Sequence, residues 1–252
     1  LEKKKLDVFF RRRKPDVVLH LASNNPSHND KNYKKYFKEN FLATYNIFHS
    51  TFNANKKAKF IFCSSSKIFK KKKGLKNEKS KNLIMSDYTK FRIKSHDMMM
   101  NYKKKNKINY INAILFNHDS KFRNKKFLIP RIINSIIKKD IVNLKEILKS
   151  NIFCDFSHAE DICNGLSKLI FGNILEDKLI FSSGKATSVN EIVKYIVKKY
   201  KINIAIDLKN FKKKKTLIGD NRLSKKLLSW KPKKNIFNAV DDIYKFYLNN
   251  NI

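Results

Sequence analysis

Residues 114–123 read Ile-Leu-Phe-Asn-His-Asp-Ser-Lys-Phe-Arg, and this stretch decides the fold that we predict. An apolar run ends at the pair Asn117-His118 and then gives way to charged residues. Open α/β sheets present polar groups to their ligands just beyond the carboxyl ends of the strands. We therefore expect this segment to end a buried strand and to form the rim of a ligand site.

Two other apolar runs share the character of the strand that ends at Asn117. They lie at 16–22 and 59–65, and, like 109–117, they are nearly continuous in hydrophobicity rather than alternating. Continuous runs are typical of parallel strands that are buried on both faces of a sheet. Helical stretches at 36–53 and 86–103 separate the three runs, so the first half predicts a doubly wound β-α-β-α-β arrangement.

The pattern changes in the second half of the chain. Isoleucines at helical spacing, with Pro130 in the first turn, predict an amphipathic helix over 128–139. Residues 179–181 are expected to return to the main sheet, and 202–208 could form a further strand.

Two Ser-x-x-Glu patterns predict helix starts. In such a capping box the serine hydroxyl accepts a hydrogen bond from an exposed backbone amide of the first turn. The boxes begin at Ser157 and Ser188, and they predict helices over 158–171 and 188–200.

The chain is strongly basic, with 57 Lys+Arg against 21 Asp+Glu and a net charge of +36. Such a charge can indicate a nucleic-acid partner. Here the lysines are spread over the whole chain and accompany many Asn and Ile residues, as codon drift in an AT-rich genome would produce. No zinc-finger, RNP-type or helix-turn-helix pattern is present, so nucleic-acid binding is not our prediction, although the charge favours nucleotide phosphates.

The cysteines and the apolar runs limit the class of protein further. Cys63, Cys154 and Cys163 are odd in number and lack Cys-x-x-Cys spacing, so neither a disulfide framework nor a metal site is predicted. No apolar stretch approaches the roughly 20 residues that cross a bilayer. The first residues, Leu-Glu-Lys-Lys-Lys, do not form a signal peptide, so we expect a cytoplasmic protein without a membrane partner.

The stretch around Asn117 resembles the Leu-Phe-Asn-His-Glu-Ser-Pro-x-Arg segment of the GDP-mannose 4,6-dehydratases, in the extended short-chain dehydrogenase/reductase family. The resemblance implies a Rossmann-like doubly wound parallel sheet with a smaller mixed α/β substrate lobe. It places a partial dinucleotide-binding domain at 1–118, with its sheet completed by 178–183, and mainly the substrate lobe at 119–252. It also implies a cytoplasmic lyase, NADP or NAD as cofactor with NADP favoured, GDP-mannose as substrate, and a possible homo-oligomer.

The family opens with a strand and a Gly-x-x-Gly-x-x-Gly loop that binds the cofactor pyrophosphate. This chain has 5 glycines and no such loop. By the resemblance, about 60 residues of the usual Rossmann half, including its first strands, are missing before residue 1. We therefore expect either a fragment of a longer reading frame or a degenerate family member.

The resemblance also implies the catalytic residues. The family carries a Ser or Thr after one strand and Tyr-x-x-x-Lys on the next helix, where the lysine lowers the tyrosine pKa and holds the nicotinamide ribose. Here Ser65 stands at the Thr position and Tyr88 at the Tyr position, while Arg92 replaces the lysine. Arginine keeps the positive charge, but its planar guanidinium is not equivalent to an ammonium.

Lys67 stands where the dehydratases have the glutamate that removes the C5 proton during loss of water. A lysine is protonated at pH 7 unless desolvation or a neighbouring cation lowers its pKa, so it cannot ordinarily accept a proton. The substitution leaves three hypotheses open. They are a dehydratase, a related 4-epimerase or 4-reductase that needs no C5 base, and a non-catalytic homologue.

The remaining site residues follow from the resemblance as well. Arg131 stands where the family has a lysine, and Cys154 replaces an arginine that binds the substrate phosphate. The predicted cofactor contacts are Leu21, Ala22, Ser23, Arg92, His118 and Arg123. The predicted substrate contacts are Asn117, Phe127, Leu128 and Arg131.

Overall fold

The computed structural model describes residues 2–24, 33–70, 73–206, 208 and 216–250. By their contacts the residues form two compact units. Unit 1 comprises Leu1–Lys70, Glu78–Leu115 and Leu166–Ile180, and unit 2 comprises Lys71–Asn77, Phe116–Gly165 and Phe181–Ile252.

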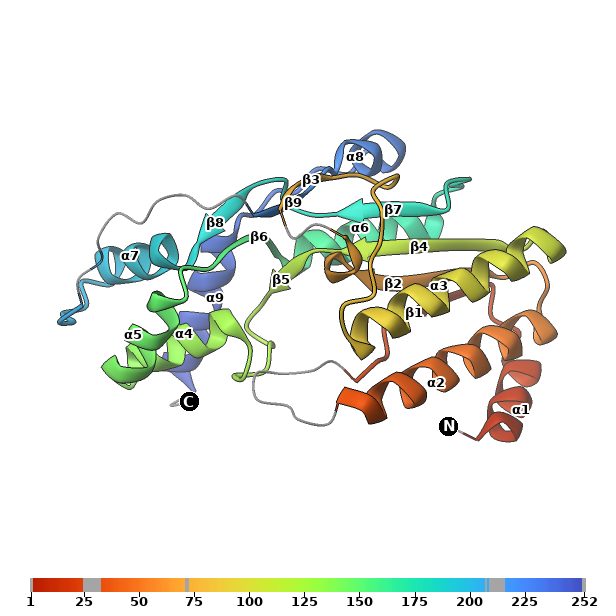
Figure 1. The fold of residues 1–252 in the computed structure, drawn as a ribbon, viewed down its shortest axis with the longest axis horizontal. Helices are drawn as coiled ribbons and strands as arrows, with labels where there is room; N and C mark the ends of the chain where they lie inside the picture. Colours follow the sequence, from red (N-terminus) through yellow and green to blue (C-terminus); the bar gives the residue numbers. More distant parts are fainter. Residues whose placement is uncertain (1, 25–32, 71–72, 207, 209–215, 251–252) are drawn as a thin grey trace. The chain divides into compact units, whose positions relative to one another are not determined.

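Unit 1 is built on a four-stranded sheet in the order β1-β2-β4-β7 (Figure 1). The pairs β1–β2 and β2–β4 are parallel, with Val17 opposite Lys59 and Lys59 opposite Asn109. The predicted parallel sheet and the return of 179–181 to it are therefore confirmed. The strand bounds are β1 (Val17–His20), β2 (Lys59–Ser65), β4 (Asn109–Leu115) and β7 (Lys178–Phe181).

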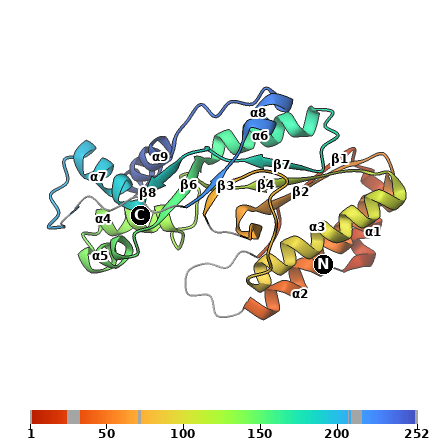
Figure 2. The same cartoon turned by 45° about the horizontal axis from the view of Figure 1, so that its top comes forward.

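Helices α1 (Lys3–Arg13), α2 (Tyr33–Ala54) and α3 (Asp87–Asn106) lie together on one side of this sheet (Figures 1 and 2). Ser86 starts α3 with a capping box to Thr89, as its hydroxyl accepts from the Thr89 amide. The core between helices and sheet is largely aromatic, and its buried members are Phe48, Phe52, Ala58, Phe60, Phe62, Phe91, Met99, Ile108 and Tyr110.

Lys59 caps the carboxyl end of α6 (Ala159–Phe171), whose last turn belongs to unit 1. The last carbonyl groups of a helix have no partner within it. The Lys59 ammonium donates hydrogen bonds to three of them, those of Leu169 at 3.2 Å, Ile170 at 2.8 Å and Gly172 at 2.6 Å. One side chain at the start of β2 thus satisfies the carboxyl end of a helix about 110 residues later.

Unit 2 contains two small sheets. The first has the order β5-β6-β8, in which β5 and β6 are parallel and β6 and β8 are antiparallel. The second pairs β3 with β9 in parallel. The strand bounds are β3 (Gly74–Lys76), β5 (Asn117–Asp119), β6 (Phe153–His158), β8 (Ala186–Ser188) and β9 (Leu217–Gly219).

The prediction of one strand over 109–117 was wrong at its end. β4 stops at Leu115, and Asn117 begins β5, which pairs with β6 instead of continuing the main sheet. Phe116 separates the two strands and is 2% exposed, and its amide donates to the Phe181 carbonyl at 2.9 Å. Phe116 thus still bonds to β7 of the main sheet, whereas the residues after it pair with β6.

Four helices of unit 2, α4, α5, α7 and α9, share a core of mainly aliphatic side chains. The predicted helices over 128–139 and 188–200 are confirmed to within two residues at each end. The bounds are α4 (Leu128–Ile137), α5 (Ile141–Lys149), α7 (Val189–Lys199), α8 (Arg222–Leu228) and α9 (Ile236–Asn249).

Two local predictions in this half were wrong. Ser157 does not cap α6, because it lies in β6 and the Glu160 amide donates instead to Nδ1 of His158. By contrast, the predicted capping box at Ser188 is confirmed, with hydrogen bonds of 2.6 and 3.0 Å between Ser188 and Glu191. The described residues of 202–208 form no strand, and residue 207 lies outside the described part.

The buried carboxylate of Asp155 links three segments of unit 2. It is 1% exposed and accepts hydrogen bonds from the amides of Ser183 at 2.9 Å, Gly184 at 3.1 Å and Gly219 at 3.1 Å. Gly184 has a φ of 77°, a conformation that side chains disfavour, and a Cβ on Gly219 would lie 2.5 Å from the Ser182 hydroxyl. Both glycines are therefore needed for the backbone to reach this carboxylate.

The contact between Lys59 and α6 predicts a loss of stability on truncation. Lys59→Met should lower the free energy of unfolding by about 1–3 kcal/mol, because three partly buried carbonyl groups lose a charged donor. Urea denaturation measures the change, and Lys57→Met, which removes an exposed lysine nearby, is the control. Equal stability of the two variants would contradict the capping role.

Candidate functional site

The carboxyl end of β1 carries the first predicted cofactor-binding segment. Leu21 and Ala22 are exposed, and Ser23 is half-buried. Asn40 of α2 fixes the backbone that follows, since its Oδ1 accepts from the Asn24 amide at 2.8 Å and its Nδ2 donates to the Asn24 carbonyl at 3.0 Å. Residues 25–32, which follow this segment, lie outside the described residues.

His20, the last residue of β1, is tied to the same helix. Its Nε2 lies 2.8 Å from the hydroxyl of Thr44. Burial, and secondarily the charge of Arg92, lower the pKa of His20 to about 4. The imidazole is therefore neutral near pH 7 and adds no positive charge beside Arg92.

Arg92 connects the ends of two strands and a helix. It is 5% exposed, and its guanidinium donates to the Ser23 hydroxyl at 2.7 Å and to the Cys63 carbonyl in the second half of β2. The same guanidinium lies over the Tyr88 ring, with its Cζ 5.2 Å from the ring centroid. The structure thus places a buried cation between a predicted cofactor segment and the predicted catalytic phenol.

A second cation lies against Tyr88. Lys67 Nζ is 5.7 Å from the centroid of the Tyr88 ring, and the lysine itself is exposed. Ser65 shapes this turn, because its hydroxyl accepts from the Lys67 amide at 3.3 Å and caps a short 3₁₀ helix, Ser66–Ile68. The side chains that the structure brings together in unit 1 are therefore Ser23, Lys67, Tyr88 and Arg92.

In unit 2, His118 lies in β5 between exposed Asn117 and buried Asp119. Its Nδ1 is 2.8 Å from the Phe116 carbonyl, which can only accept, so Nδ1 carries the proton and Nε2 keeps a lone pair. Burial lowers the pKa of His118, while the bond to Phe116 opposes this shift. A neutral imidazole with one free acceptor results.

Arg123 and Phe127 form a stacked pair beyond β5. The Arg123 guanidinium carbon is 3.8 Å from the centroid of the Phe127 ring, and its Nε is 3.8 Å from Oδ1 of Asp119. Leu128 and Arg131, in the first turns of α4, are each half-buried. Sequence reasoning did not single out Asp119, although the family resemblance has an acid at its position.

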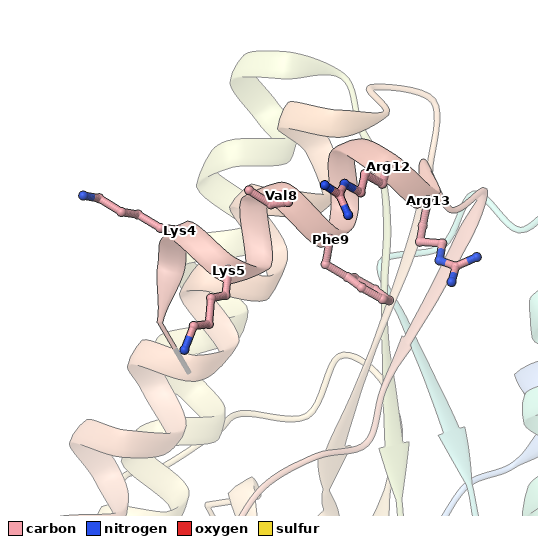
Figure 3. Close-up of a pocket in the computed structure, with 6 residues that line it drawn as sticks. All are labelled: Lys4, Lys5, Val8, Phe9, Arg12 and Arg13. Carbon is pink, nitrogen blue, oxygen red and sulfur yellow. The ribbon is translucent and has the colours of Figure 1, made fainter.

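A hollow of about 430 Å³ lies elsewhere, against the outer face of α1 (Figure 3). None of the predicted site residues lines it. Its lining side chains all come from this one helix and are Lys4, Lys5, Val8, Phe9, Arg12 and Arg13.

Two classes of feature are not found among the residues that the structure describes. No group of three or more His, Cys, Asp and Glu side chains is arranged to hold a metal ion. No helix in the same residues has the length and apolar character that crossing a bilayer requires.

Comparison with known proteins decides the family. The sequence profile of the GDP-mannose 4,6 dehydratase family matches residues 1–243. The chain belongs to this family. Its members are nicotinamide-dependent nucleotide-sugar dehydratases and epimerases of the extended short-chain dehydrogenase/reductase type.

One curated relative in this family is the human GDP-mannose 4,6 dehydratase. It is 24% identical over 201 residues, which are 69% of this chain and 54% of the human protein. The chain therefore spans about half of the length of the curated relative it matches.

Several solved structures have a fold similar to that of this chain. RMD from Pseudomonas aeruginosa, complexed with NADPH, has a TM-score of 0.83 at 16% identity and covers 99% of this chain and 85% of its own. UDP-glucuronic acid 4-epimerase from Bacillus cereus, in complex with NAD, has a TM-score of 0.81 at 19% identity over 99% and 79%. dTDP-glucose 4,6-dehydratase from Bacillus anthracis, also with NAD, has 0.81 at 14% identity over 99% and 77%. The predicted fold class is thereby confirmed.

The position of Arg92 predicts a graded loss of stability. Arg92→Met should lower the free energy of unfolding by about 2 kcal/mol, because the hydrogen bonds to Ser23 and Cys63 are lost. Arg92→Lys should lose less, because its ammonium can still donate to one of the two acceptors, although it cannot span both. Chemical denaturation measures both, with Lys94→Met, an exposed change on the same helix, as control. An Arg92→Met variant as stable as the control would contradict this role.

The depressed pKa of His20 predicts a pH dependence of stability. The unfolded histidine, with a pKa of 6.5, binds a proton below that pH, whereas the folded one does so only near pH 4. The stability from neutral His20 is therefore present above pH 6.5 and lost as the pH falls toward 4. Between pH 6 and 5, wild type should lose about 1 kcal/mol more than His20→Gln. Parallel curves in urea denaturation would refute the assignment.

Proposed function

We propose that the chain acts in an NAD(P)-dependent nucleotide-sugar enzyme of the GDP-mannose 4,6-dehydratase type, which converts GDP-mannose to GDP-4-keto-6-deoxymannose. The observation that carries the proposal is the arrangement around Tyr88, with Arg92 one helical turn away and bonded to Ser23. NADP is the cofactor we favour. We assign unit 1 to the dinucleotide and unit 2 mainly to the sugar nucleotide, in line with the predicted domains 1–118 and 119–252.

The residues present fit a phosphate-bearing nucleotide. Arg92 supplies a fixed positive charge at the carboxyl end of β1, where open α/β sheets bind nucleotides. Arg123 is one-third exposed, and its buried Nε has no hydrogen-bond acceptor among the described residues. A nicotinamide nucleotide held at Arg92 would accept and return a hydride. The guanidinium groups of arginines such as Arg92 and Arg123 bind phosphate oxygens well.

The roles that we propose for the other residues follow the family resemblance. Tyr88 exchanges a proton with the C4 oxygen of the sugar, and the hydroxyl of Ser65 donates a hydrogen bond to that oxygen. His118 offers its free Nε2 as an acceptor, since its Nδ1 proton is bound to the Phe116 carbonyl. Asn117 is exposed and can hydrogen-bond the substrate, while Phe127, Leu128 and Arg131 contact its nucleotide part.

Lys67 favours a second candidate, a 4-epimerase or 4-reductase. A dehydratase needs a base for the C5 proton, and a carboxylate serves this purpose better than an ammonium. Lys67 lies exposed beside the Tyr88 ring, where it places a cation instead of that base. An epimerase or reductase works at C4 alone and needs no base at this position. A non-catalytic homologue would show neither reaction.

Turnover in heavy water distinguishes these candidates. With GDP-mannose and NADP, the dehydratase reaction gives a 6-deoxy sugar that carries deuterium at C5, which mass spectrometry and NMR detect. Lys67→Glu restores the carboxylate and should raise this rate by about 10²-fold, the usual contribution of a general base. Lys70→Glu, an exposed change three residues away, is the charge-matched control. A C4-modified product without C5 deuterium would reject the dehydratase in favour of the second candidate.

A further inference from the structure

Asp119 is a buried acid beside the residues proposed to bind the nucleotide. It ends β5 and is 6% exposed. Its carboxylate forms one ion pair, with Nε of Arg123 at 3.8 Å, and no hydrogen bond to it is found among the described residues. A buried carboxylate with so few partners is costly. Its presence therefore calls for an explanation beyond packing.

The Arg123 side chain contacts Asp119 and Phe127 and is partly exposed to solvent. Asp119 lies at its Nε, and the Phe127 ring lies 3.8 Å from its guanidinium carbon. The arginine side chain is 33% exposed. The carboxylate is too distant to form a hydrogen bond, so it orients the guanidinium by charge without using its N–H groups. These groups remain available to an anion.

The other charged and titratable groups around Asp119 are engaged elsewhere. His158, its register partner on β6, lies 3.1 Å from the Asp242 carboxylate. His118 is bound to the Phe116 carbonyl. Lys125 lies over the ring of Tyr247, a residue of α9 that is 2% exposed and whose pKa is raised by burial and by the charge of Asp119. Among the described residues, Arg123 is therefore the cation that balances the negative charge of the Asp119 carboxylate.

The ionised form of Asp119 lowers the stability of the fold. Burial raises the pKa of Asp119 to about 7 from 3.8, although the charge of Arg123 opposes the shift. Between these values the folded state binds a proton that the unfolded state does not, so stability falls as the pH rises toward 7. Acids that are kept at such a cost occur mainly at functional sites.

We propose that Asp119 is a positioning residue for Arg123, holding the guanidinium against Phe127 while its carboxylate is ionised and releasing it when the carboxylate takes up a proton. This inference rests on the proposed function in one respect, because that function makes Arg123 a contact of the cofactor. Its consequence is cofactor binding that weakens as the pH falls through about 7.

The order of the Arg123 side chain tests the proposal without any ligand. In ¹⁵N NMR relaxation, Nε of Arg123 should be ordered at pH 8 and mobile at pH 6. In Asp119→Asn it should be mobile at both values. Glu146→Gln, which removes an exposed carboxylate of α5 in the same unit, should behave as wild type. Equal order of Arg123 in wild type and Asp119→Asn would overturn the proposal.

Titration with NADPH, followed by its fluorescence, tests the link to function. At pH 8, Asp119→Asn should bind NADPH about fivefold more weakly than wild type, and its affinity should no longer fall between pH 8 and 6. Tighter binding by the variant would mean that the carboxylate merely offsets the charge of Arg123, which contradicts a positioning role. If wild type binds no NADPH at either pH, the proposed cofactor is rejected, while the order of Arg123 still decides the inference.

Discussion

The buried positive charge of Arg92 is the constraint on which the proposed catalytic region depends. A guanidinium cannot lose its proton in a protein, so its burial requires acceptors with fixed geometry. Here the acceptors are the Ser23 hydroxyl, which follows β1, and the Cys63 carbonyl, which lies in the second half of β2. Because Arg92 also lies over the Tyr88 ring, one side chain sets the positions of two strand ends and the predicted catalytic residue.

Unit 2 is organised by a buried charge of opposite sign. Asp155 accepts hydrogen bonds from the amides of two segments that are far apart in the sequence, Ser183 and Gly184 in one and Gly219 in the other. The break at Phe116 has a similar effect, because it turns the Asn117-His118 pair from the main sheet toward β6. In each unit, therefore, one buried charged side chain, Arg92 or Asp155, binds main-chain groups in or near the strands.

The sequence predicted the parallel sheet well, because continuous apolar runs such as 59–65 can be buried only on both faces of a sheet. It also placed Arg92 one turn beyond Tyr88, since that spacing follows from helix geometry. It missed the pairing of β3 with β9, because three-residue strands such as Gly74–Lys76 leave no periodic pattern.

The other errors have equally local causes. Ser157 fits a capping box in sequence but is buried in β6, and tertiary pairing overrides the local preference. Asp119 carries no signal in one sequence, because an acid after a strand is usually exposed, and only the structure shows that it is buried against Arg123.

Calorimetric titration of NADPH into wild type, Arg92→Met and Lys94→Met tests the central claim, that the Ser23, Tyr88 and Arg92 region binds a nicotinamide nucleotide. The account predicts that wild type and Lys94→Met bind one NADPH per chain with equal affinity. Arg92→Met should bind at least about tenfold more weakly, because a charged donor near the cofactor is lost. Equal binding by all three, or no binding by wild type, would contradict the account.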